Sequence, residues 1–271
     1  FAEEKFESLN PTNTEEVLGV FQKGTADDAR DAIAAARVAF PGWRDTPWQE
    51  RVAIMRKVAE NIDKRTFEIG AAMAMEVGKN RMEALGDIAE TADLIRYACG
   101  QMEANDGFIV EMESDPLIGY KSTNRSVLKP YGVWLVISPF NFPGALTGGP
   151  SGAALVAGNT LIMKPSSDTP WTTRLLVECF RDGGLPNGVV NYVTGPGRTM
   201  GNALVQSDEL DGLTFTGSYN VGMGIYRSFA EGKYVRPTIL ELGGKNPAVV
   251  SRHADLERAA LGIVRSAFGL Q

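Results

Sequence analysis

The sequence has few cysteines, a single histidine and no excess of positive charge. Two cysteines among 271 residues cannot build a disulfide framework, and one histidine with no acidic cluster beside it gives no basis for a metal site. Acidic side chains outnumber basic ones, 33 to 27, whereas proteins that bind a phosphate backbone usually present a basic face. The acidic start at Phe1–Lys5 lacks the apolar core of a signal peptide. We therefore expect a cytoplasmic protein with no metal and no nucleic-acid partner.

An unbroken hydrophobic run is also lacking. No charged residue occurs between Lys129 and Lys164, a length that would be sufficient for a membrane span. Prolines, glycines and asparagines interrupt this stretch, beginning with Pro139, Asn141 and Pro143. We therefore predict short strands and helices here, and no contact with a membrane.

Residues 25 to 105 predict helices. Thr25 and Asp28 form a capping-box-like start, and the apolar run that follows stops at Pro41-Gly42. After Gly78, apolar residues three or four apart predict one buried helix stripe: Met82, Leu85, Ile88, Ala92, Ile95 and Cys99. The intervening polar residues are expected on the solvent side: Arg81, Glu83, Asp87, Glu90, Asp93 and Arg96.

Beyond residue 130, apolar strands alternate with helices. The strands are predicted at residues 131–137, 160–163, 189–193, 212–215 and 238–242. Helices are predicted near residues 150–157, 171–181 and 221–229, after residue 197 and from about residue 255. Strands that are apolar on both faces and alternate with helices are typical of a parallel sheet covered on both sides. The sequence therefore predicts an α/β fold with a doubly wound, mainly parallel sheet, and an extended ribbon at residues 117–129.

In an open parallel sheet, ligands bind beyond the carboxyl ends of the strands, so the residues after each strand are informative. Five such segments combine glycine or proline with polar side chains: Ser138–Pro143, Lys164–Ser167, Thr194–Gly197, Phe215–Gly222 and Glu241–Asn246. Together and in this order they resemble the aldehyde dehydrogenase superfamily, and the resemblance covers nearly the whole chain. Three further segments are most similar to the glutamate semialdehyde (1-pyrroline-5-carboxylate) dehydrogenases within it: Glu76–Asn80, Asn124–Gly132 and Ser266–Gln271.

This resemblance implies an organisation and an activity. It implies a helical N-terminal part of the cofactor-binding domain at residues 1–116, an oligomerisation ribbon at 117–129, a dinucleotide-binding core at 130–247, and the start of a truncated catalytic domain at 248–271. The implied reaction is the NAD- or NADP-dependent oxidation of an aldehyde to its acid through a cysteine thioester, in a homo-oligomer. Glutamate 5-semialdehyde, a substrate of proline catabolism, is the implied aldehyde, with succinate semialdehyde or an aromatic aldehyde as alternatives.

The resemblance also implies roles for individual residues. Asn141 matches the amide that stabilises the developing oxyanion, and Glu241 matches the base that activates water. On the residues alone, the alternatives are that Asn141 satisfies a turn beside Pro143 and that Glu241 is a solvated strand end. The implied cofactor contacts are Ser138, Phe140, Lys164, Ser167, Gly197, Gly217, Ser218, Gly222, Leu242 and Gly243.

Ser167 is a departure from many NAD-preferring relatives, which carry Glu at this step. A carboxylate would accept from the adenosine ribose hydroxyls and repel the additional phosphate of NADP, whereas a serine can donate to that phosphate. We therefore expect NADP to be tolerated and NAD still to be used.

The nucleophilic cysteine that this chemistry needs is missing from the motifs. Cys99 and Cys179 both fall on apolar helix faces, where a thiol is expected to be inert. The resemblance implies that the nucleophile follows Gln271. Two hypotheses result: the chain is the cofactor-binding part of an oxidoreductase, or it is a non-catalytic nucleotide-binding protein.

Overall fold

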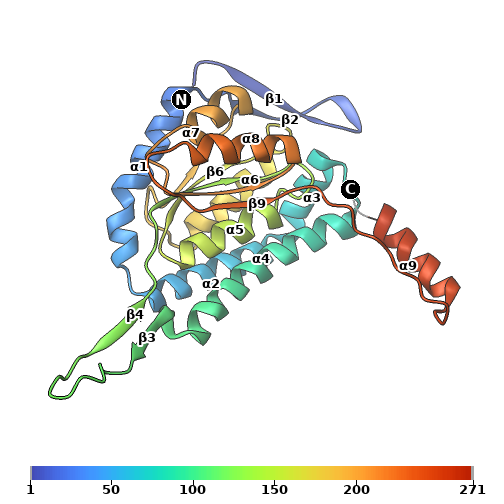
Figure 1. The fold of residues 1–271 in the computed structure, drawn as a ribbon. Helices are drawn as coiled ribbons and strands as arrows, with labels where there is room; N and C mark the ends of the chain where they lie inside the picture. The colour runs from blue at the N-terminus through green and yellow to red at the C-terminus, as the bar shows by residue number, and fades with distance from the viewer. Residues whose placement is uncertain (1, 270–271) are drawn as a thin grey trace.

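A β-hairpin opens the computed structural model, which describes residues 2 to 269. Strands β1 (Lys5–Asn10) and β2 (Asn13–Gln22) pair antiparallel and lie along one border of the molecule (Figure 1). The hairpin is joined to a distant loop, because Thr194 Oγ1 donates to the carbonyl oxygen of Gln22 at 2.6 Å and Gly24 N donates back to Thr194 O at 2.9 Å. The sequence analysis did not predict this hairpin.

Helix α1 (Ala26–Asp45) begins as predicted and ends later. Both hydrogen bonds of the capping box between Thr25 and Asp28 are formed. The predicted end at Pro41-Gly42 is wrong, because the helix continues through both residues. The last turn is held by Trp43, which is 1 % exposed and donates from Nε1 to the carbonyl oxygen of Leu155. Burial of a large aromatic side chain outweighs the one helix hydrogen bond that a proline removes.

Three more helices follow, α2 (Trp48–Lys64), α3 (Thr66–Val77) and α4 (Arg81–Ala104). The predicted buried stripe of α4 is confirmed for Ile88, Ile95 and Cys99. The prediction is wrong for Met82, which is 79 % exposed in the first turn, and for Asp87, which is 2 % exposed instead of facing solvent. Asp87 is buried because it has charged and backbone partners on other elements, which a periodic pattern cannot reveal.

An arm projects from the base of the molecule after a 3₁₀ turn at Asp106–Phe108 (Figure 1). Its strands β3 (Ile109–Met112) and β4 (Asn124–Val127) pair antiparallel. The arm begins earlier than the ribbon expected at residues 117–129. That expected segment covers the second strand and part of the connection between the strands.

Five parallel strands form the central sheet, which confirms the predicted fold class. They are β5 (Val133–Ile137), β6 (Thr160–Lys164), β7 (Val190–Tyr192), β8 (Gly212–Thr216) and β9 (Thr238–Glu241). Their order is β7-β6-β5-β8-β9. The chain thus winds outwards from β5 in one direction and then returns to the other side at β8. Such a reversal leaves a crevice beyond the carboxyl ends of the two central strands.

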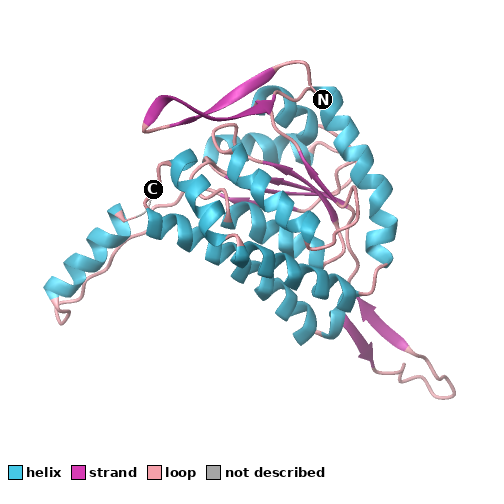
Figure 2. Cartoon of the chain, turned by 180° about the vertical axis from the view of Figure 1, so that it is seen from behind, coloured by secondary structure: helices cyan, strands magenta, loops and turns pink. Residues whose placement is uncertain are grey.

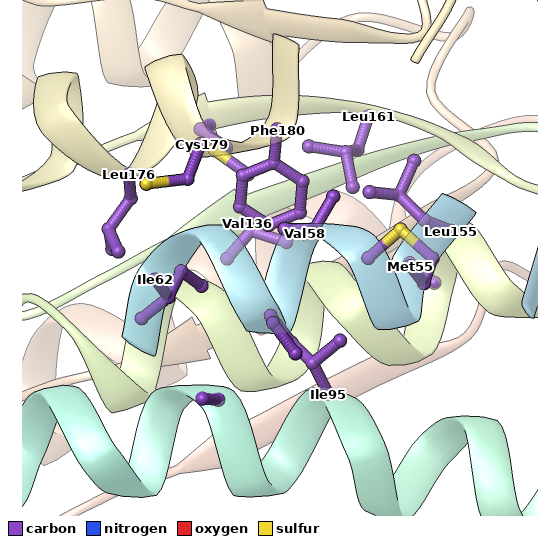
Figure 3. Close-up of a cluster of buried hydrophobic side chains, with 14 of the residues drawn as sticks. Met55, Val58, Ile62, Ile95, Val136, Leu155, Leu161, Leu176, Cys179 and Phe180 are labelled. Carbon is purple, nitrogen blue, oxygen red and sulfur yellow. The ribbon is translucent and has the colours of Figure 1, made fainter. Parts of the chain in front are cut away.

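Helices cover both faces of the sheet. On one face lie α1, α7 (Asn202–Val205) and α8 (Tyr219–Ala230), with a π-helical turn at Gly197–Gly201 before α7. On the other lie α5 (Ala145–Val156) and α6 (Pro170–Asp182), which pack against α2, α3 and α4. Figure 3 shows this second core, where Phe180 of α6 lies with Val136 of β5 and Val58 of α2.

Helix α9 (Leu256–Phe268) stands away from the rest of the chain (Figure 2). None of its described side chains is buried. Within residues 2 to 269, no helix has both the length and the apolar character needed to cross a membrane.

Candidate functional site

A cleft of about 630 Å³ opens beyond the carboxyl ends of β5, β6, β8 and β9. It is lined by every residue that the sequence analysis assigned to the site except Gly222: Ser138, Phe140, Asn141, Lys164, Ser167, Gly197, Gly217, Ser218, Glu241, Leu242 and Gly243. Residues more than 100 positions apart therefore share one cavity at the reversal of the strand order. Their individual roles remain predictions.

Lys164 is the buried cation of the cleft. It ends β6 and is 5 % exposed, and its Nζ donates to the carbonyl oxygen of Pro165 at 3.1 Å. Burial lowers the pKa of this amine to about 8, because the charged form has lost most of its hydration. A primary amine here can donate to the hydroxyl or phosphate groups of a ligand in the cleft.

Two serines lie near Lys164. The backbone N–H of Ser138 donates to Lys164 O at 3.3 Å, while the buried hydroxyl of Ser138 has no hydrogen-bond partner within residues 2 to 269. The hydroxyl of Ser167 donates to Gly195 O at 3.2 Å. An unpaired buried hydroxyl is costly unless a ligand or water completes it, so Ser138 marks a position where the cleft can take a polar group.

The start of α8 forms another wall of the cleft. Ser218 is its N-cap, and the Ser218 hydroxyl accepts from Val221 N at 3.5 Å. Gly217 N donates to Glu241 O at 3.0 Å, which joins this turn to β9. A helix N-terminus with free first-turn N–H groups favours an anion such as a phosphate.

Gly222 lies on α8 but does not line the cleft. A Cβ atom there would be 2.3 Å from Leu242 Cδ2 and 3.2 Å from Phe215 Cε1. Its missing side chain lets α8 approach β8 and the residues after β9. The structure therefore gives Gly222 a packing position, and the cofactor contact expected of it remains a prediction.

Glu241 ends β9 with an exposed carboxylate. It lines the 630 Å³ cleft and also a second hollow of about 550 Å³. The walls of this second hollow include α5, the base of the arm, and side chains of β8 and β9. A carboxylate at the border of two hollows can accept a proton from a water molecule in either of them.

Asn141 lies in the loop between β5 and α5, and its side chain is partly buried. Its neighbour Phe140 is 53 % exposed and forms an aromatic wall of the cleft. The loop is followed at once by Gly144 and Ala145, where α5 begins. A side-chain amide in this position can donate to an oxygen atom bound in the cleft.

Two buried carboxylates behind the cleft were missed by the sequence reasoning. Glu76 accepts from Trp171 N, Thr172 N and the Thr172 hydroxyl, and so caps α6. Asp87 accepts from Ala145 N at 2.6 Å and pairs with Lys79. Burial raises the pKa of both carboxyls. Hydrogen bonds partly offset this rise at both residues, and the charge of Lys79 does so at Asp87. The usable signal was the segment Glu76–Asn80, which carries both Glu76 and Lys79 and precedes the predicted helix stripe.

Neither cysteine reaches the cleft. Cys99 and Cys179 are fully buried, and burial raises the pKa of each thiol to about 11. A thiol of this kind is protonated at neutral pH and is a poor nucleophile. Among the described residues, no group of three or more histidine, cysteine or acidic side chains could hold a metal ion.

Comparisons of the chain with known protein families, relatives and solved structures agree with this architecture. The model of the aldehyde dehydrogenase family matches residues 1–271. The 1-pyrroline-5-carboxylate dehydrogenase of Anoxybacillus flavithermus is 41 % identical over 272 residues, which are 98 % of this chain and 52 % of the relative. The chain thus spans about half the length of the curated relatives it matches.

Two solved structures have the same fold over nearly the whole chain. One is 1-pyrroline-5-carboxylate dehydrogenase from Thermus with bound NAD, with a TM-score of 0.91 and 34 % identity over 99 % of this chain and 52 % of that one. The other is the NADP-dependent glyceraldehyde-3-phosphate dehydrogenase of Bacillus halodurans complexed with NADP, with a TM-score of 0.90 and 33 % identity over 98 % of this chain and 55 % of that one. The chain belongs to the aldehyde dehydrogenase family.

Proposed function

We propose that the polypeptide carrying this chain oxidises an aldehyde to the carboxylic acid with NAD or NADP. One observation carries the proposal: a single cleft contains a side-chain amide, a buried amine and a carboxylate, from Asn141, Lys164 and Glu241. These groups suit, respectively, an oxyanion, a phosphate or ribose, and a water molecule.

We propose that this cleft holds the dinucleotide. Its volume of about 630 Å³ is in the range of small-molecule sites. A Cβ on Gly197 or Gly243 would meet no described residue within 4 Å, so both leave open space at the walls. Lys164, the Ser138 hydroxyl and the start of α8 would hold the polar groups, and the bound nicotinamide would supply a hydride acceptor.

In this proposal the chain supplies an oxyanion donor and a base. The Asn141 amide donates to the aldehyde oxygen as negative charge develops on it, a contact that contributes about 3 kcal/mol in comparable sites. Glu241 takes the proton of the water molecule that cleaves the thioester, and so releases the acid. The two groups therefore act at different stages of one reaction.

We place the nucleophilic cysteine outside these residues. Both thiols of this chain are buried away from the cleft, and the matched relative is about twice as long as the segment it shares with the chain. The first test is the intact mass of the polypeptide in a natural preparation. A mass near that of these residues alone would leave the polypeptide without a nucleophile and would contradict the proposal.

For the substrate we propose glutamate 5-semialdehyde. Support comes from the relatives, since the proteins of Anoxybacillus flavithermus and Staphylococcus saprophyticus are both named 1-pyrroline-5-carboxylate dehydrogenase, at 41 % and 38 % identity. The test compares kcat/KM for glutamate 5-semialdehyde, succinate semialdehyde and an aromatic aldehyde. Each rate is measured from the absorbance of reduced nicotinamide. A higher kcat/KM for either alternative would overturn the assignment. No reduction with any aldehyde would favour a non-catalytic nucleotide-binding role.

We further propose that the protein is cytoplasmic. We also propose that the β3–β4 arm joins copies of the protein into a homo-oligomer. Apolar side chains are exposed on the arm, among them Val110, Met112 and Ile118. Exposed apolar surface of this kind is typical of a protein interface. Replacing the three residues by serine should lower the mass measured by light scattering, and an unchanged mass would contradict the assignment.

A further inference from the structure

A fully buried ion pair lies behind the loop that carries Asn141. Lys79 Nζ and Asp87 Oδ2 are 3.0 Å apart, and neither side chain has any exposed surface. Lys79 follows the left-handed Gly78 at the end of α3, and Asp87 lies in the second turn of α4. Two buried charges lose their hydration, so a pair like this often adds little to stability compared with apolar side chains of similar size. Stability alone therefore does not explain it.

Both members of the pair hold the residues that follow Asn141. The second carboxylate oxygen of Asp87 accepts a hydrogen bond from Ala145 N, at the first residue of α5, over 2.6 Å. The backbone N–H of Gly144 also donates to this carboxylate. Lys79 Nζ lies 3.5 Å from the centre of the Phe142 ring, in the geometry of a cation–π contact. The pair thus contacts Phe142, Gly144 and Ala145.

Gly144 packs closely against α4. A Cβ on this residue would be 2.7 Å from Asp87 Oδ1 and 2.9 Å from Thr91 Oγ1. On the other side of Asn141, Ser138 N donates to Lys164 O at 3.3 Å. The loop is therefore anchored to the sheet before Asn141 and to the ion pair after it.

We propose that Lys79 and Asp87 are positioning residues that fix Asn141 for oxyanion stabilisation, an inference that rests on the proposed function. The carboxylate sets the direction of the first N–H groups of α5. The ammonium contacts the Phe142 ring and neutralises the carboxylate, so the pair leaves no net negative charge behind the Asn141 loop. An apolar pair could fill the same space but could not accept these N–H groups.

The test replaces the pair in the full-length enzyme. K79M/D87L should fold, because apolar side chains replace both charges, and should lower kcat at least tenfold with the KM for the cofactor unchanged. K79M/D87N restores an acceptor for Ala145 N and should recover part of kcat. The control is the partly exposed pair Arg65–Glu178, which is 2.9 Å apart and does not line the cleft; R65M/E178L should leave kcat at the parental value.

A second measurement separates positioning from general damage. N141A alone should lower kcat about 100-fold or more. If the pair acts through Asn141, adding K79M/D87L to N141A should lower kcat no further. A full additional tenfold loss, or a parental kcat for K79M/D87L, would overturn this inference alone. A parent enzyme that reduces no cofactor with any aldehyde would overturn the proposed function and the inference with it.

Discussion

A Cβ atom on Gly222 would lie 2.3 Å from Cδ2 of Leu242, a side chain that lines the cleft. The G222A substitution should therefore push Leu242 into the cleft. We expect a net loss of about 1 kcal/mol in stability, because overpacking costs about 1–3 kcal/mol and the better helix former returns up to about 1 kcal/mol. Cofactor affinity should fall as well. Thermal unfolding and calorimetric titration with NADH measure the two effects.

Gly224 provides the control on the same helix. A Cβ there would meet no atom of the described part of the chain within 4 Å, so G224A should raise stability by up to about 1 kcal/mol through helix propensity alone. Its cofactor affinity should be unchanged. If G222A and G224A behave alike, the packing argument for Gly222 is wrong.

Lys164 makes stability depend on pH in the alkaline range. Its pKa is about 8 in the folded protein against 10.5 in the unfolded chain. Between these values the unfolded chain binds a proton that the folded chain has released, so the free energy of unfolding rises with pH. The slope is up to about 1.4 kcal/mol per pH unit. Denaturant unfolding from pH 7 to pH 10 measures it, and K164M should remove this contribution.

Cofactor binding should show the opposite trend with pH. Only the protonated Lys164 carries the charge that attracts a phosphate, so affinity for NADP should weaken as pH rises above about 8. In K164M the affinity should be low and flat over this range. A parental affinity that stays constant up to pH 10 would show that the amine does not contact the cofactor.

Ser167 should determine tolerance of NADP. In S167E, a carboxylate replaces a hydroxyl that now donates to Gly195 O and would repel an additional phosphate. We expect kcat/KM for NADP to fall at least tenfold, with that for NAD changed less. The S167A variant is the control for loss of the hydroxyl. A parent enzyme whose NADP turnover is already a hundredfold below its NAD turnover would contradict the expected tolerance.

Glu241 should limit the second half of the reaction. E241Q keeps the size of the side chain and removes the base, so steady-state turnover should fall about 100-fold or more. The first turnover should still produce a burst of reduced cofactor, because hydride transfer precedes thioester cleavage. Rapid mixing measures the burst. E231Q, at the exposed C-cap of α8, should behave as the parent does.

The fold and the cleft were predictable because both follow from local patterns. Apolar strands indicated a parallel sheet, and the carboxyl ends of its strands gather at one edge, so Asn141, Lys164 and Glu241 were expected together. The burial of Asp87 was not predictable in the same way, because its partners lie on α5 and beyond α3. The periodicity of apolar residues identifies the buried face of one helix. It contains no information on which charged side chain has a partner on another element.

The hydrogen bond from Thr194 to Gln22 joins residues 172 positions apart. During synthesis, the N-terminal hairpin therefore leaves the ribosome long before its docking site exists. At about 5–20 residues per second, the interval is roughly ten to thirty seconds. Over that time the hairpin lacks the contacts with Thr194 that hold it in the folded chain, so a chaperone that covers the hairpin should raise the yield of native protein more than one that acts after release.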